Sequence, residues 1–185
     1  MNSNLQLVGL IATEVAPDES ELAPAFLDAY LAGGQRRRDL FQPAGHELGA
    51  AGASTFLMAV IPAVLEGLAF TSGVAMLVLK GKDLSDDVLG IIKSGLSIYE
   101  IKSKAFTFFK SGKERGGAAT SSDGKAKAWE ALSHVIETLS AQLQKCGLNP
   151  DQCDAATLRV IRVLLENPVA AETLLKDLGK SADKT

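Results

Sequence analysis

The side chains that could carry out acid–base, metal or thiol chemistry are few and scattered along the chain. There are two histidines, His46 and His134, and two cysteines, Cys146 and Cys153, with six residues between them in "CGLNPDQC". A structural zinc site needs four protein ligands, so the cysteines would have to recruit both histidines. We interpret the cysteines as two free thiols at helix ends. The alternative is a short-loop disulfide, which would form only in an oxidising compartment.

The glycine-rich stretches and the histidines do not match catalytic or nucleotide-binding motifs. The glycines of "GHELGAAGA" lack the spacing of a dinucleotide-binding loop, and "GGAATSSDGKA" lacks the first glycine of a phosphate-binding loop. His46 has no second histidine at zinc-helix spacing, and His134 is expected to be partly buried beside the apolar face of its own helix. We therefore predict no catalytic residue, metal, cofactor or small-molecule substrate, and a chain that is not an enzyme.

Length and composition favour a helical domain that does not bind nucleic acid. At 185 residues the chain can bury a sizeable core without disulfides or metals. Hydrophobic residues make up 46% but aromatic residues only 5%, so the core must consist mainly of Leu, Ile, Val and Ala. That mixture suits helices better than a β-sandwich. The net charge of −3 argues against a nucleic acid partner.

Apolar residues recur at helical spacing through the second half of the chain. They predict one long amphipathic helix over 84–111 and another over 129–146. Two further helices, at about 150–166 and 168–178, each begin with an asparagine followed by proline. Asparagine caps helix starts well, and proline fits the first helical position.

The first half of the chain gives a helix before the glycine pair at 33–34 and two short ambiguous runs. Residues 5–12 and 74–79 are apolar but too short for periodicity to separate helix from strand. Each run could be a helix or a short strand, so the fold is predicted to be mostly helical with at most a little sheet.

Residues 48–79 form a long apolar tract that could be a central helical pair or a membrane span. We divide it at Gly67 into two helices, and expect Glu66 to reach water at the end of the first. A carboxylate near the middle of a span is costly, and Pro62 also weakens a continuous helix. In the first half, small residues recur every four positions and would let another backbone come close. These small residues are Thr55, Ala59, Ala63 and Gly67.

Basic residues supply the remaining candidate interaction sites. Arg36, Arg37 and Arg38 form the densest basic cluster, which is either a solvated turn or a contact for an acidic partner or lipid phosphates. Lys93 and Lys104 lie on the polar side of the long helix after the apolar tract. We count these five residues, with the small-residue stripe, as candidate interaction residues.

Composition divides the chain into two helical regions. Residues 1–112 would form a bundle around the apolar pair, 113–124 a flexible linker, and 125–185 a smaller helical unit with a frayed tail. Residues 1–34 hold five acidic groups and no lysine or arginine, whereas 80–116 hold eight basic and five acidic groups. This opposition of charge would help the pieces pack, or help copies associate.

These features predict a non-enzymatic interaction or assembly module that binds a protein partner or copies of itself. The alternative is a membrane-active protein that inserts the hairpin 48–79 into lipid as a pore former or membrane anchor. The N-terminus lacks the positively charged segment of a secretory signal, so we expect a cytoplasmic location, or a membrane-associated one under the alternative.

Overall fold

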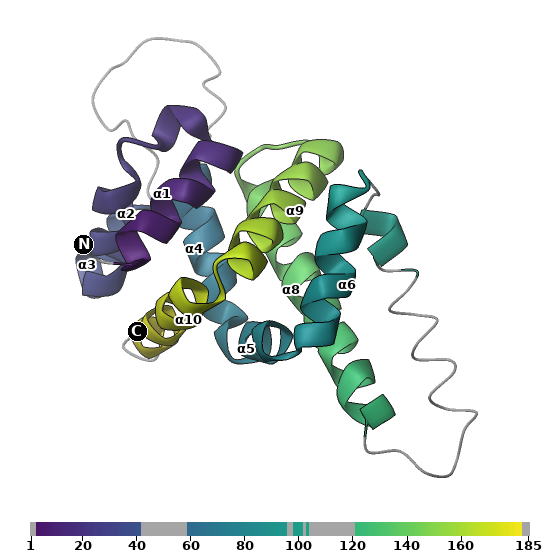
Figure 1. The fold of residues 1–185 in the computed structure, drawn as a ribbon. Coiled ribbons are helices and arrows are strands. Elements are labelled where there is room, and N and C mark those ends of the chain that lie inside the picture. Colours follow the sequence, from purple (N-terminus) through teal and green to yellow (C-terminus); the bar gives the residue numbers. More distant parts are fainter. Residues whose placement is uncertain (1–2, 42–58, 96–97, 102, 104–120, 183–185) are drawn as a thin grey trace.

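The computed structural model describes residues 3–41, 59–95, 98–101, 103 and 121–182 (Figure 1). Within these ranges the regular elements are all helices, so the predicted all-α fold is confirmed. Their bounds in chain order are α1 Ser3–Val15, the 3₁₀ helix η1 Pro17–Glu19, α2 Ala23–Ala32, α3 Gly34–Asp39, α4 Val60–Phe70, α5 Ser72–Lys80, α6 Lys82–Lys93, α8 Ser121–Lys145, α9 Pro150–Glu166 and α10 Pro168–Ala182.

Both segments that the sequence left open as strands are helical. Residues 5–12 lie inside α1 and residues 74–79 lie inside α5, so of the two alternatives the helix is the one found at both segments. In α1 the buried side chains include Leu7, Val8 and Ile11, a spacing of one, three and four that only a helix directs to one side. Packing of this face on α9 and α10 decided between the two conformations.

A single hydrophobic core joins the helices on both sides of residues 104–120. Helix α8 packs against α4 and α5 and also against α9, while α10 packs against α1, α4 and α5 (Figure 1). Trp129 of α8 and Leu7 of α1 belong to the same buried cluster. The region 125–185, which the sequence set apart, therefore shares its core with the helices of 1–112.

The predicted linker and the long helix before it end differently from expectation. The last four residues of the 113–124 linker form the start of α8, and its earlier residues lie outside the described ranges. The helix expected over 84–111 is interrupted, because α6 ends at Lys93 and Gly95 follows with a φ of +73°. A left-handed glycine after the last turn is a common way to end a helix.

One of the two asparagine–proline starts works as predicted. The Asn149 side chain accepts a hydrogen bond from the Gln152 backbone N–H at 2.9 Å, and the Gln152 side chain accepts from the Asn149 N–H at 3.0 Å. This reciprocal pair is a capping box at the start of α9. The Asn167 side chain instead donates backwards to the Val163 carbonyl of α9 at 2.9 Å.

Helix α10 continues past residue 178, where the sequence predicted the last helix to end. It runs to Ala182, through Gly179, where a Cβ would lie 2.8 Å from the Ser72 Oγ of α5. Gly179 thus serves close packing of α10 on α5, because the missing side chain lets the two helices approach.

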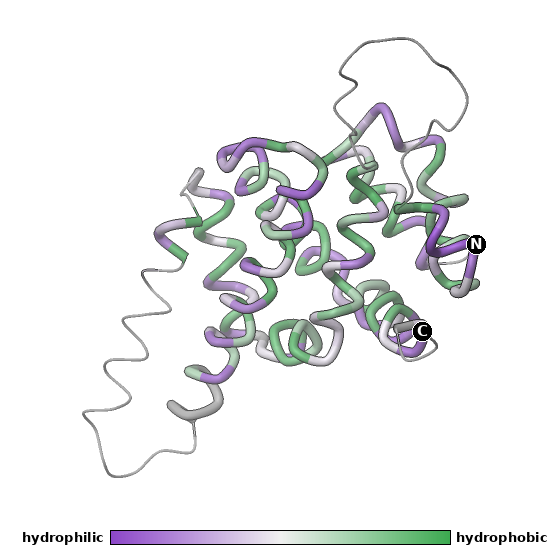
Figure 2. Tube along the Cα trace, turned by 180° about the vertical axis from the view of Figure 1, so that it is seen from behind, coloured by the Kyte–Doolittle hydropathy of each residue, from purple (hydrophilic) through white to green (hydrophobic). Residues whose placement is uncertain are grey.

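The described part of the apolar tract, residues 59–79, forms two helices that meet at Thr71, four residues after the predicted break. The Thr71 backbone N–H and hydroxyl both donate to the Gly67 carbonyl, at 3.1 and 2.8 Å, and close the last turn of α4. Helices α4 and α5 bend by 78° at this point. Gly67 remains inside α4. Figure 2 shows mostly hydrophobic residues along this pair of helices. Along the amphipathic helices, hydrophobic and hydrophilic residues alternate.

Among the described helices, none is by itself long and apolar enough to cross a membrane. Helices α4 and α5 together reach the required length and composition, but only as the bent pair. In this structure eight of the eleven residues of α4 are buried among other helices. The apolar character of α4 is therefore satisfied within the fold.

Candidate functional site

The three neighbouring arginines do not act as one cluster. They all lie on the short helix α3, where Arg36 and Arg38 are exposed and Arg37 is buried. Successive residues on a helix point about 100° apart, so one of three must face inward when the helix lies on a core. Arg36 and Arg38 stay candidates for an outside contact, whereas Arg37 is used inside the molecule.

Arg37 takes part in a polar cluster that sequence reasoning did not predict. Its Nη2 lies 2.8 Å from Glu66 Oε2 of α4, and its guanidinium carbon lies 4.4 Å from the centre of the Tyr30 ring. The Tyr30 hydroxyl donates to the same Glu66 oxygen at 2.6 Å. The side chains of Arg37 and Glu66 are only 10% and 17% exposed. Glu66 is therefore paired inside the fold, and the expectation that it reaches water was wrong.

The cluster also joins the C-terminal helix. Arg37 Nη1 donates to the Ser181 carbonyl at 3.4 Å, and Ser181 Oγ donates to the Tyr30 carbonyl at 3.1 Å. Burial raises the pKa of the Tyr30 phenol, and the adjacent Glu66 raises it further. The phenol therefore stays a hydrogen-bond donor. Each polar group here is engaged by another part of the chain, so the cluster fixes α2, α3, α4 and α10 to one another.

The predicted small-residue stripe faces the interior of the chain. Ala59 is the residue before α4, and Ala63 and Gly67 are buried on that helix. A Cβ on Gly67 would lie 2.9 Å from Leu139 Cδ2 and 3.5 Å from Leu139 Cα, so α4 and α8 approach closely here. The close helix contact that the stripe indicated is thus made with α8. Thr55 lies outside the described residues.

The two candidate lysines have separate positions. Lys93 ends α6, and its Nζ lies 3.8 Å from Glu166 Oε1 of α9, with both side chains largely exposed. Pairs of this kind contribute little free energy. Lys104 lies outside the described residues.

The two cysteines are free and buried. The Cys146 thiol lies 3.7 Å from the Ala59 carbonyl, and burial raises its pKa to about 11, with Glu19 adding to the shift. Burial likewise raises the pKa of Cys153. A thiol with a raised pKa is a poor nucleophile at neutral pH, so this pair has a packing role. In the part of the chain that the structure describes, no three His, Cys, Asp or Glu side chains are grouped to hold a metal.

One concave surface of the described residues is an open groove between α5 and α8, which we call the α5–α8 groove. It encloses a volume of about 520 Å³, within the range of ligand-binding clefts in general. Its apolar part includes Leu77, whose side chain is 54% exposed. The lining residues are Val74 and Leu77 from α5, and Lys127, Glu130, Ala131, Ser133, His134 and Glu137 from α8.

Helical spacing places the polar lining residues along one wall. Glu130, His134 and Glu137 are separated by four and three positions on α8, so they lie on one face of it. His134 is exposed, and the expectation that it is partly buried was wrong because the apolar face of α8 turns the other way, toward the core. Ser133 and His134 are neighbours in sequence and point in different directions, which does not form a nucleophile–base pair.

Two signals in the sequence pointed weakly to these features. A lone carboxylate such as Glu66 in an apolar helix usually has a partner, because unpaired burial is costly. The partner itself, Arg37, is 29 residues away and was not identifiable. The α8 residues that line the groove recur at helical spacing, which the sequence shows. The exposure of Leu77 depends on how α5 packs in the fold, which the sequence does not show.

The fold and the groove define this chain as an all-α domain with an open, partly apolar cleft on one face. Comparison of the chain with protein-family models, curated proteins and solved structures found no match.

Proposed function

We propose that this protein is a non-enzymatic interaction module that binds a helical segment of a protein partner in the α5–α8 groove. The observation that carries the proposal is the placement of Leu77 in the lining of an open cleft, with more than half of the residue exposed. Large apolar side chains exposed inside a rimmed cleft are typical of surfaces that another protein covers.

The groove has the construction of a helix-binding site. Val74 and Leu77 of α5 give it exposed apolar area, which we call the apolar floor, and carboxylates from α8 border that area. Helix-in-groove complexes combine such an apolar floor with polar edges, and the bound helix supplies anchors at every third or fourth residue. Phe70, 62% exposed at the end of α4, is a further exposed apolar residue on the same bent pair of helices, outside the groove lining.

Site-specific crosslinking followed by measured binding tests the proposal. A photoreactive amino acid at position 77 should capture a partner from cells of the source organism, and the same group at the exposed Leu10 of α1 should not. The captured protein, once purified, should bind the unmodified chain in calorimetry. Leu77→Asp should weaken that binding at least tenfold, while Leu10→Asp leaves it unchanged. Equal binding by both variants would rule out the groove as the interaction site.

Insertion into a membrane through α4 and α5 is a second candidate function. It is favoured by the length and apolar composition that these two helices reach together. In this structure α5 packs against α10, and α4 packs against α8. Insertion would require both of these contacts to break. The bend of 78° would also have to open or to form a re-entrant hairpin.

A disulfide between α5 and α10 tests whether α5 has to leave α10 for the protein to act on a membrane. The Cβ of a residue at 179 would lie 3.5 Å from the Ser72 Cβ, at the short end of the range for disulfides. The Ser72→Cys/Gly179→Cys variant would therefore tie α5 to α10. If the chain is membrane-active, dye release from anionic vesicles should stop in the oxidised variant and return on reduction. Release that is absent from the unmodified chain, or unaffected by the lock, would eliminate this function.

A further inference from the structure

We infer that the partner of the α5–α8 groove is a cationic amphipathic helix, with lysine or arginine residues seven positions apart on either side of its apolar anchors. This inference rests on the proposed binding function and adds the chemistry of the partner. It follows from where the carboxylates stand relative to the apolar floor.

The dimensions of the groove set the length of the helix it can hold. The α8 residues that line it run from Lys127 to Glu137, a rise of about 15 Å at 1.5 Å per residue. A bound helix lying along the groove would therefore contact it over about three turns. Three turns present two or three apolar anchors at helical spacing, which would cover the floor formed by Val74 and Leu77, three positions apart on α5.

The charges of the wall set the chemistry of the edges. Glu130 and Glu137 are both exposed and lie seven residues apart, two helical turns or about 10.5 Å along the axis. The lining residues between these two glutamates are Ala131, Ser133 and His134, and none of them is a carboxylate. The lysine of the wall, Lys127, stands before the pair and already takes part in an interaction within the chain.

A partner helix with two cations at the same spacing would meet both carboxylates at once. An anionic helix would place its carboxylates against Glu130 and Glu137. The repulsion between these like charges would weaken its binding, just as ion pairing would strengthen the binding of a cationic helix. The apolar floor would hold either helix by burial, so the sign of charge decides between them. Salt should reduce the preference, because the Debye length falls from about 10 Å at 0.1 M to about 3 Å at 1 M.

Two synthetic helices provide the test with the full chain. Both carry the same leucine anchors over three to four turns and a staple on the outer face, which removes the low helicity of short peptides. One has lysine on each side of the anchors and the other has glutamate. Fluorescence anisotropy at low salt should show that the lysine helix binds about tenfold more tightly, the scale expected of two partly exposed ion pairs.

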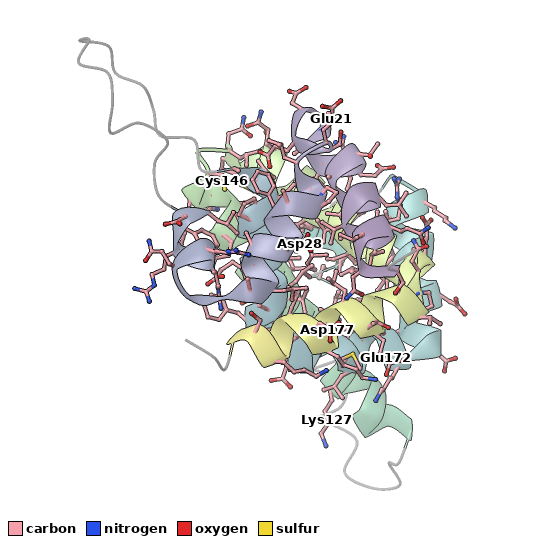
Figure 3. The ribbon with its side chains drawn as sticks, turned by 90° about the vertical axis from the view of Figure 1, so that its left-hand side faces the viewer. Glu21, Asp28, Lys127, Cys146, Glu172 and Asp177 are labelled. Atoms are coloured by element: carbon pink, nitrogen blue, oxygen red, sulfur yellow. The ribbon has the colours of Figure 1, made fainter. Side chains whose placement is uncertain are left out.

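Matched variants assign the effect to the groove. Glu130→Gln with Glu137→Gln should remove the tenfold preference while both helices still bind. Glu21→Gln with Asp28→Asn, two exposed carboxylates at or on α2, should leave it unchanged. Figure 3 shows Glu21 at the opposite end of the molecule from Lys127. Leu77→Asp should abolish binding of both helices, with circular dichroism confirming that the exposed substitution leaves the fold intact.

The outcomes distinguish this inference from the proposed function. Equal affinity for the two helices, with both lost in Leu77→Asp, would overturn the cationic partner and leave the groove as a binding site. Failure of both helices to bind, or binding that Leu77→Asp does not weaken, would overturn both statements. A concentration-dependent dimer in sedimentation that Leu77→Asp dissociates would assign the groove to a second copy and overturn the inference.

Discussion

Arg37 Nη2 and Glu66 Oε2 lie 2.8 Å apart. The two residues come from helices α3 and α4, and residues 42–58 lie between these helices in the sequence. The pair holds the short helix α3 against the apolar helix α4. Both side chains are nearly buried, so neither charge is well solvated without the other. The same Glu66 oxygen accepts the Tyr30 hydroxyl, which makes the carboxylate the centre of the cluster.

Removing one member of this pair should destabilise the fold strongly. Arg37→Met or Glu66→Met leaves the remaining charge unpaired, at a cost of about 3 kcal/mol, the lower end of the range for buried pairs, because some exposure remains. The double variant should cost less than the sum, since no charge is left unpaired. Urea unfolding measures all three. Arg36→Met and Arg38→Met, on the exposed side of α3, should change stability by no more than about 0.5 kcal/mol. Strict additivity would contradict the pairing.

Stability should fall at alkaline pH, and Tyr30 should account for part of the slope. Because its pKa is raised in the fold above the unfolded value of 10.0, the folded chain keeps the phenol proton that the unfolded chain loses. This contribution is complete below about pH 10 and is lost as pH rises above it, by up to about 1.4 kcal/mol per pH unit. Urea midpoints measured between about pH 8 and 11 should decline less steeply in Tyr30→Phe.

Two further variants control this pH experiment. The Cys146 thiol, whose pKa is raised from 9.0 to about 11, adds a decline of the same sign that begins near pH 9. Cys146→Ala should therefore flatten the lower part of the curve. Tyr99→Phe alters a side chain that is 76% exposed and should leave the slope as it is. A slope that Tyr30→Phe leaves unchanged would show that the phenol is not held neutral by the fold.

Gly67→Ala should test the close approach of α4 and α8. The added Cβ would come within 2.9 Å of Leu139 Cδ2, and Leu139 is fully buried and has little room to rotate. We expect a loss of about 1–3 kcal/mol from overpacking, although alanine favours helix. Gly90→Ala is the matched control, because α6 leaves open space there, and it should stabilise the chain by about 0.5–1 kcal/mol. Thermal unfolding of both variants distinguishes packing from helix propensity.

Glu19 should act as a long-range cap of α4. Its Oε1 and Oε2 accept the Val60 and Ile61 backbone N–H groups at 2.8 and 2.9 Å, so one carboxylate satisfies two free donors at the helix start. Glu19→Ala should cost about 1–2 kcal/mol in chemical denaturation. Glu21→Ala, two positions along and exposed, serves as the control and should have almost no effect. A loss no larger than that of the control would mean the cap does not stabilise α4.

The sequence predicted helices well where a local rule acts alone. The apolar periodicity of α8 and α9 and the capping asparagine at 149 depend on neighbours within one or two turns, and the structure contains them. It failed where a single residue had two uses. The last helix was predicted to end at 178, but the next residue, Gly179, lies inside α10 and contacts α5; the helix predicted over 84–111 is interrupted by Gly95, which follows the end of α6.

The sequence by itself determined the all-α class, the apolar pair, and the small-residue contact surface of α4, because these follow from composition and from periodicities of three and four residues. Only the tertiary structure decided that Arg37 faces inward, that Glu66 is paired, and that Leu77 stands exposed in a groove. Each of these depends on how whole helices are placed in space. Such placement is set by the summed burial of many side chains distant in sequence, which no local pattern records.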